Sequence, residues 1–216
     1  MTKVETSMTR RVPVIISMVC AGAFALSPLS ALAADAEGRF APRGIGPVSC
    51  TQFLQALEER QENVFFAAGW LEGYLTAINQ FLDDTFDIAP WQDTDTILNL
   101  VRNNCERNPD QRMFAIVNSM VEFLSDQRLQ AASDRTMVEH GEQRTLIYRA
   151  VLRDVQQELI DKGLLEGTAD GQFGAMTRTA IEQFQQEQNI AVTGIPDQMT
   201  LWLLLGGGTT PPPQGG

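Results

Sequence analysis

Histidine, cysteine and lysine are the scarce residues of this sequence. Its 216 residues include one histidine, three cysteines and two lysines. Soft-metal sites and imidazole catalysis draw on histidine and cysteine, so little material is present for either. The formal net charge of −11 argues against a nucleic-acid partner, because phosphate binding needs clustered basic side chains. The composition, 44% hydrophobic and 20% charged, is that of a globular chain with one domain or two small ones.

The first 34 residues have the order of a secretory signal. Lys3, Arg10 and Arg11 precede an apolar stretch, and Ala31-Leu32-Ala33 matches the small-x-small cleavage pattern. A membrane anchor is the alternative, but proline and small residues interrupt the stretch. We expect a signal peptide at 1–34, export to the periplasm and no stable membrane span after cleavage. Cleavage would remove three basic residues and one acidic residue, which changes the net charge to −13.

Two cysteines, Cys50 and Cys105, follow the expected cleavage site. An exported chain with two cysteines is expected to pair them. In the chain-entropy model a cross-link closing a loop of this size stabilises the fold by about 4 kcal/mol. A reactive thiol at Cys50, near the start of a helix, is the alternative.

Residues 49–125 are predicted to form a helical domain after a Gly-, Pro- and Ala-rich spacer at 35–48. Ser49 and Gln52 have the spacing of a capping box at the start of the first helix. Further along, Cys105 lies on the apolar side of a predicted third helix. Asn108-Pro109 predicts the start of a fourth helix, because asparagine caps helices and proline suits the first helical position. We therefore expect four helices and one cross-link.

The second of these helices, 64–82, is the most apolar. Five residues recur in it at intervals of three and four and predict a buried face: Phe66, Trp70, Tyr74, Ala77 and Phe81. A transmembrane helix is the alternative, but Glu72 in the middle would cost about 3 kcal/mol in a bilayer. Gly69 and Gly73 lie four residues apart, so another helix could approach closely there. With Trp70 and Tyr74 they form a candidate contact surface.

An acidic loop follows at 83–95. Its carboxylates are ligands that calcium prefers, but the spacing lacks the glycine of a helix-loop-helix calcium site. We expect a solvated loop in which Asp93 or Asp95 caps the next helix. Residues 58–122 as a whole hold 12 acidic residues against four arginines, so most of the net negative charge belongs to this domain.

The rest of the chain divides into a polar segment, a second ordered unit and a tail. Residues 126–144 show no apolar periodicity and predict a linker or a solvent-exposed helical extension. Residues 145–205 predict three helices separated by glycine turns, with Gly163 ending the first and Pro196-Asp197 opening the last. Residues 206–216 are rich in Gly, Thr and Pro and predict a disordered tail.

No catalytic constellation stands out. The sequence has no Gly-x-Ser-x-Gly elbow, no Ser-x-x-Lys pair, no zinc signature and no phosphate-binding glycine loop. Carboxylate pairs such as Glu58-Glu59 are adjacent in a helix, so they point about 100° apart rather than at one bond. His140 has no evident partner. We expect a protein that is not an enzyme, with no catalytic residues, no metal and no cofactor.

Residues 151–205 resemble the small three-helix peptidoglycan-binding domain. The resemblance is carried by Val155-Gln156-x-x-Leu159, Gly163-Leu164-Leu165-x-Gly167, Asp170-Gly171-x-Phe173-Gly174-x-x-Thr177, Ala180-x-x-x-Phe184-Gln185, Thr193-Gly194 and Asp197-x-x-Thr200. It implies that peptidoglycan is held in a shallow groove by polar groups near the 170–178 turn. The implied binding residues are Asp170, Gly171, Phe173, Gly174, Thr177 and Arg178. Arg178 could meet a peptide carboxylate.

Residues 48–124 are similar to two exported helical families of Gram-negative bacteria, the HdeA-type acid-stress chaperones and the Tai-type immunity proteins. Ser49-Cys50-x-x-Phe53-Leu54, Trp70-Leu71-x-Gly73-Tyr74 and Val101-x-x-x-Cys105-x-x-Asn108-Pro109 carry this similarity. Both families join helices with a cysteine pair.

The sequence thus predicts an all-helical, non-catalytic, exported protein that binds peptidoglycan through its C-terminal unit. Its N-terminal unit would bind a periplasmic protein partner. The alternatives are an acid-stress chaperone, an immunity protein against a toxin that degrades the cell wall, and a cell-wall hydrolase.

Overall fold

The computed structural model describes residue 35 and residues 37–206. The predicted signal peptide at 1–34 and residues 207–216 of the predicted tail lie outside the described residues. Residues 1–40 form one unit and residues 41–216 form another. In the described part of the first unit, the Asp35 carboxylate accepts hydrogen bonds from the backbone N–H groups of Glu37 and Arg39 and from the Arg39 guanidinium.

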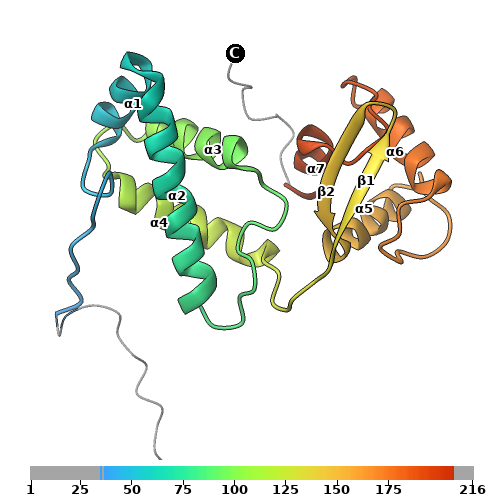
Figure 1. The fold of residues 1–216 in the computed structure, drawn as a ribbon, viewed down its shortest axis with the longest axis horizontal. Helices are drawn as coiled ribbons and strands as arrows, with labels where there is room; N and C mark the ends of the chain where they lie inside the picture. The colour runs from blue at the N-terminus through green and yellow to red at the C-terminus, as the bar shows by residue number, and fades with distance from the viewer. Residues whose placement is uncertain (1–34, 36, 207–216) are drawn as a thin grey trace, which may run out of the picture. The chain divides into compact units, whose positions relative to one another are not determined.

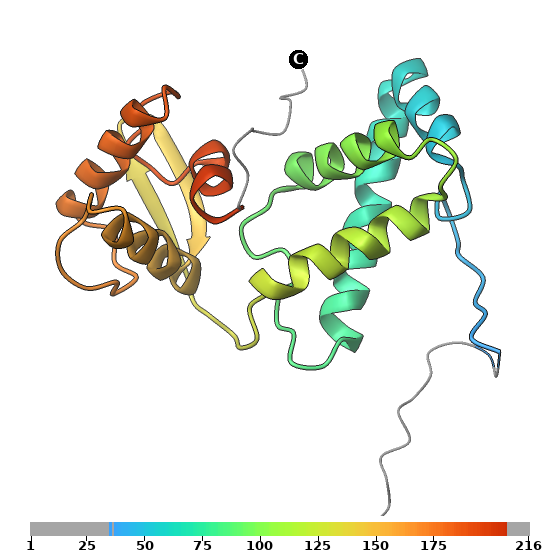
Figure 2. The same cartoon turned by 180° about the vertical axis from the view of Figure 1, so that it is seen from behind.

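The second unit contains two sets of elements (Figures 1 and 2). The first set is α1 (Cys50–Glu59), α2 (Gln61–Phe81), α3 (Thr94–Arg107), α4 (Met113–Leu124) and the 3-10 helix η1 (Ser125–Gln127). The second set is β1 (Arg135–His140), β2 (Gln143–Tyr148), α5 (Arg149–Asp161), α6 (Ala175–Glu187) and α7 (Gln198–Leu205). The described chain is mostly helical, with one small two-stranded sheet.

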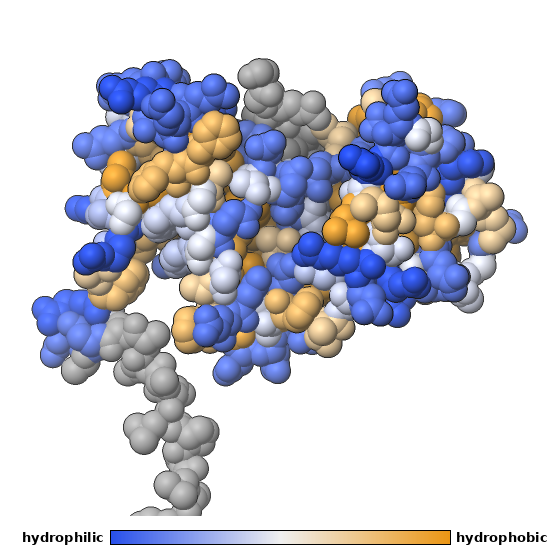
Figure 3. Space-filling view, in the orientation of Figure 1, coloured by the Kyte–Doolittle hydropathy of each residue, from blue (hydrophilic) through white to orange (hydrophobic). Residues whose placement is uncertain are grey.

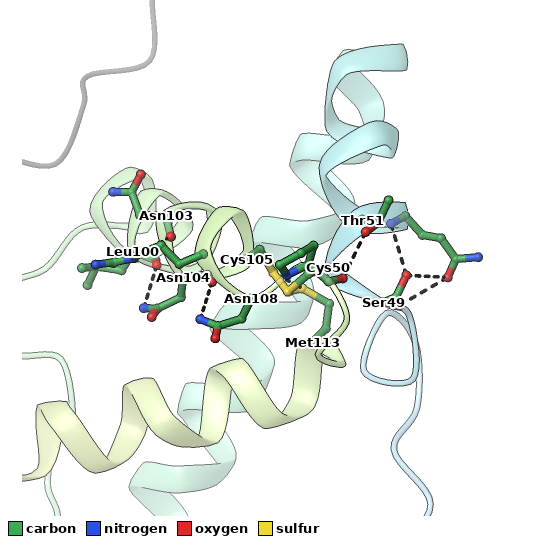
Figure 4. The surroundings of a disulfide bond; sticks show 12 residues. Ser49, Cys50, Thr51, Leu100, Asn103, Asn104, Cys105, Asn108 and Met113 are labelled. Atoms are coloured by element: carbon green, nitrogen blue, oxygen red, sulfur yellow. Dashed lines mark hydrogen bonds between the residues drawn. A yellow bond between two sulfur atoms is a disulfide. The ribbon is translucent and has the colours of Figure 1, made fainter.

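The Cys50–Cys105 disulfide joins α1 to α3, which confirms the predicted pairing (Figure 4). Both cysteines are fully buried, and the Cys105 Sγ lies 3.6 Å from the Met113 Sδ at the start of α4. Ser49 and Gln52 form the predicted capping box at the start of α1. The bond therefore lies where three helices meet, in the core formed by α1 to α4.

The predicted start of the fourth helix at Asn108-Pro109 is wrong, because α4 begins at Met113. The backbone of this segment pairs with the chain that enters α1. The Cys50 N–H donates to the carbonyl of Gln111 at 2.8 Å, and the Met113 N–H donates to the carbonyl of Val48 at 2.9 Å. Asn108 instead ends α3.

The buried face predicted for α2 is only partly right. The buried residues of α2 are Ala67, Leu71 and Leu75, and the predicted Trp70 and Tyr74 are half-buried against the same core. By contrast, Phe66 is 61% exposed and Phe81 is 77% exposed. The apolar residues of α2 cover a broad arc rather than a narrow stripe, so periodicity alone did not select the part that packs. That part is set by α1 and α3, the helices that α2 contacts most. In Figure 1, α2 crosses in front of α4, and in Figure 2 it lies behind α3 and α4.

Strands β1 and β2 form an antiparallel hairpin that corrects the all-helical fold class. The hairpin starts inside the 126–144 segment, so the interpretation of that segment as a helical extension is wrong. His140 pairs with Gln143 across a two-residue turn in which Gly141 has a φ of +59°. Among the strand residues only Val138, Ile147 and Tyr148 are buried, so alternation is too weak to reveal the strands.

Helices α5, α6 and α7 build a second core with the hairpin. In both views the hairpin lies along one side of α5 and α6 (Figures 1 and 2). As predicted, Gly163 follows the end of α5 with a φ of +73°. Asp197 caps α7 by accepting a hydrogen bond from the Thr200 N–H. One residue of this core, Trp91, comes from the loop before α3.

In that acidic loop, Asp93 caps α3 as predicted, with its carboxylate 2.8 Å from the Thr96 N–H. The described residues contain no group of three or more His, Cys, Asp or Glu side chains that could hold a metal ion. Among them there is also no helix with the length and apolar character needed to cross a bilayer.

Candidate functional site

The turn between α5 and α6 is organised by Gln156, a buried residue of α5. Its side-chain Nε2 donates to the Asp170 carboxylate and the Gln172 carbonyl, each at 3.0 Å, and to the Thr177 hydroxyl at 3.1 Å. Its Oε1 accepts a 2.7 Å bond from the Gly171 N–H. Three of the predicted binding residues, Asp170, Gly171 and Thr177, are thus brought together around one amide.

This network leaves different parts of the three residues exposed. Gly171 is buried, has a φ of +71°, and a Cβ there would lie 2.7 Å from the Arg149 carbonyl, so only glycine fits. Thr177 is buried as well. Asp170 is exposed, and hydrogen bonds from the Gln172 N–H and the Gln156 amide lower the pKa of its carboxyl below the usual value. Of the three, Asp170 therefore has a charged group in reach of a ligand.

The turn between α6 and α7 is built in the same way around Gln185, which is fully buried. Its Nε2 donates to the hydroxyls of Thr193 and Thr200 at 2.8 Å and to the carbonyl of Ile195 at 3.0 Å. Its Oε1 accepts from the N–H groups of Thr193 and Gly194, both at 2.9 Å. In each turn a buried glutamine holds a glycine of positive φ and the threonine six residues after it.

Sequence reasoning did not identify Gln156 and Gln185 as organising residues. A signal was present, because each follows an apolar core residue, Val155 or Phe184, on the buried side of its helix. A polar residue at such a position needs hydrogen-bond partners inside the fold. The two Gly-x5-Thr spacings indicate where those partners lie.

The other predicted binding residues lie apart from the Gln156 network. Phe173 is half-buried against the second core, and Gly174 precedes the first turn of α6. The Arg178 Nε lies 3.4 Å from the Glu182 carboxylate, which is also 3.6 Å from the His140 Nε2. A Cβ on Gly194 would touch all three of these side chains. Arg178 therefore lies beside the second turn rather than beside Asp170.

A shallow groove adjoins the second turn. It has a volume of about 470 Å³ and is lined by Ile190, Ala191, Asp197, Gln198 and Met199. The Asp197 carboxylate in its wall already accepts bonds from the Thr193 hydroxyl and the Thr200 N–H. The groove thus offers apolar contact surface with a few fixed polar groups, which is the usual make-up of a small-molecule site. The resemblance seen in the sequence predicts a groove near the first turn, at residues 170–178.

One part of the chain is similar to a known protein family. Residues 149–204 match the family described as a putative peptidoglycan binding domain. The match covers α5, α6 and nearly all of α7, so both glutamine-centred turns lie inside it. No curated protein and no solved structure matches the chain. The family match thus supports a peptidoglycan-binding domain at residues 149–204.

Proposed function

We propose that this is an exported, non-catalytic protein that attaches to peptidoglycan through residues 149–204 and binds a protein partner through residues 49–125. The family match of the C-terminal domain is the observation that carries the proposal. The Cys50–Cys105 disulfide supports export to the periplasm, because disulfides form and persist in oxidising compartments.

The C-terminal domain has the chemistry to hold a glycan with peptide branches. The groove beside the second turn would take sugar rings against Ile190 and Met199. The Asp170 carboxylate is exposed, and the lowered pKa of its carboxyl keeps it ionised to lower pH, so it would accept hydrogen bonds from hydroxyl, amide or ammonium groups. Arg178 would donate to a peptide carboxylate if it exchanged its contact with Glu182.

The N-terminal domain has an outer face suited to protein contact. Phe66 and Phe81 are exposed near the two ends of α2, and Gly69 and Gly73 lie exposed between them. A Cβ on either glycine would meet nothing within 4 Å, so packing among the described residues does not account for them. An exposed helical glycine costs about 1 kcal/mol relative to alanine, which suggests an external partner. Hydrophobic patches are visible on this side of the domain in Figure 3.

Two more specific roles for this domain fit the same exposed phenylalanines. An acid-stress chaperone would bind unfolded clients at low pH, and it would bind the dye ANS more strongly near pH 3 than at pH 7. An immunity protein would form a stable complex with a secreted toxin that degrades the cell wall. The two are separated by whether binding needs acid, measured by titration calorimetry at both pH values.

Sedimentation with purified sacculi tests peptidoglycan binding. The chain lacking residues 1–34 should pellet with sacculi, and Asp170→Asn and Arg178→Gln should each weaken binding several-fold. Glu166→Gln is the matched control, because Glu166 is exposed in the same loop and is absent from the Gln156 network. Failure of the unmodified chain to pellet would rule out the proposal. Dye release from labelled sacculi would show instead that the protein is a hydrolase.

A further inference from the structure

A second and larger cleft lies between the first helices and α7, inside the compact 41–216 unit. Its volume is about 710 Å³. Its lining includes three charged residues, Glu58, Asp95 and Arg102, and the first residues of α7, Gln198 and Met199. This volume is in the range of small-ligand sites.

The walls of the cleft are held together by the Gln198 side chain at the start of α7. Its Oε1 accepts from the Asp93 N–H at 3.2 Å and from the Thr96 hydroxyl at 3.1 Å. Its Nε2 donates to the Trp91 carbonyl at 2.7 Å. The rings of Trp91 and Trp202 add an edge-to-face contact with centroids 6.3 Å apart. These contacts join α7 to the loop before α3 and to the start of α3.

Charged side chains of both signs line the cleft without forming hydrogen bonds or ion pairs among the described residues. Within the described chain, the side chains of Glu58, Asp95 and Arg102 form no hydrogen bond or ion pair. Half-buried apolar side chains, among them Val64 and Met199, also line the cleft. A neutral sugar would desolvate these charges without pairing them, which is unfavourable. A ligand with an ammonium group, a carboxylate and apolar side chains would pair with both signs and cover the apolar surface.

Short peptides have this chemistry, and the peptide branches of peptidoglycan are the peptides that the neighbouring domain would bring here. Gln198 and Met199 line both this cleft and the 470 Å³ groove of the C-terminal domain. The two sites are therefore adjacent at one helix start. A glycan strand in the groove would therefore lie close to the larger cleft.

We propose that the 710 Å³ cleft binds the peptide branch of peptidoglycan, with Glu58 and Asp95 holding its ammonium group and Arg102 its carboxylate. This inference rests on the proposed attachment to peptidoglycan. In this proposal the N-terminal helices α1 and α3 contact peptidoglycan as well.

The test compares two double variants with the same change of charge. Glu58→Gln with Asp95→Asn alters the cleft, whereas Glu62→Gln with Glu106→Gln alters exposed positions on α2 and α3 that do not line it. Binding is measured on intact sacculi and on sacculi stripped of peptide by an amidase. Thermal melts of each variant show that the fold is retained.

On intact sacculi we expect the cleft variant to bind about tenfold more weakly, corresponding to about 1.4 kcal/mol, and the control to bind like the unmodified chain. On stripped sacculi the cleft and control variants should bind alike. Arg102→Gln should also weaken binding to intact sacculi, which a site for simple cations would not show. If the unmodified chain binds but the cleft and control variants bind alike on intact sacculi, the cleft assignment is wrong and peptidoglycan attachment stands. If the unmodified chain does not bind at all, the proposed function itself fails.

Discussion

Replacing Gln185 by leucine should destabilise the C-terminal domain. Leucine fills a similar volume but removes the acceptor of the Thr193 and Gly194 N–H groups. The Ile195 carbonyl also loses a donor, but it still accepts from the Asp197 N–H at 2.9 Å. Each backbone group left unpaired in the interior costs about 1–3 kcal/mol, so two cost about 4 kcal/mol. Burial of the leucine side chain returns about 2 kcal/mol. The Thr200 hydroxyl keeps its bond to Asp197. The expected net loss is about 2 kcal/mol.

Urea unfolding followed by tryptophan fluorescence measures this loss. Trp91 and Trp202 belong to the second core, so their signal reports the domain that contains Gln185. With a slope of about 2 kcal/mol per molar, the midpoint should fall by about 1 M. Gln186→Leu is the control, since Gln186 is the exposed neighbour and its change should cost less than about 0.5 kcal/mol. A loss below about 1 kcal/mol for Gln185→Leu would refute the view that this amide holds the turn.

Three further measurements test other parts of the structure. Gly171→Ala should cost about 2 kcal/mol more than Gly163→Ala in urea unfolding, because both have positive φ but only a Cβ on Gly171 would clash with the Arg149 carbonyl. Equal losses would contradict this packing. Replacing Cys50 and Cys105 together by alanine should destabilise the first core by about 4 kcal/mol and leave the Trp91 and Trp202 transition in place, unless the two cores unfold only together. The lowered pKa of Asp170 means that the unfolded chain binds this proton more readily, so the carboxylate stabilises the fold above about pH 4 and that contribution is lost as the pH falls further. Acid titration of stability should therefore be shallower in Asp170→Asn, and identical curves would show that the carboxyl contributes nothing.

Local signals in the sequence predicted the helix ends well, because a cap depends on residues only three or four positions apart. The capping box of Ser49, the carboxylate cap of Asp93 and the glycine after α5 were all predicted and are confirmed. The prediction that Asn108 starts a helix is wrong for a physical reason. Its segment is bonded to residues near 50, and such a long-range backbone pairing has no local signature.

Tertiary context also decided the two larger errors. In α2 the apolar residues cover a broad arc, so the part of it that packs is set by α1 and α3 as well as by the helix's own pattern. In the hairpin, only Val138, Ile147 and Tyr148 among the strand residues are buried, so period-two alternation never becomes strong. As a result, the exposed surface of α2 was not predicted, because the helix was assigned to the core. The β1–β2 hairpin was not predicted either, because its first strand lies in a segment assigned to a linker.

The predicted binding residues contain the same ambiguity between fold and function. Gly171 and Thr177 belong to a motif whose parts are tied to Gln156, and Gly194 and Thr200 are tied in the same way to Gln185. Internal hydrogen bonding therefore accounts for the glycine, the threonine and the glutamine of each turn without any ligand. Charged side chains without such internal ties are better candidates for recognition, because nothing else in the described chain uses them. By that criterion the charged residues of the cleft beside the start of α7 are better candidates for ligand contacts than the glycine turns.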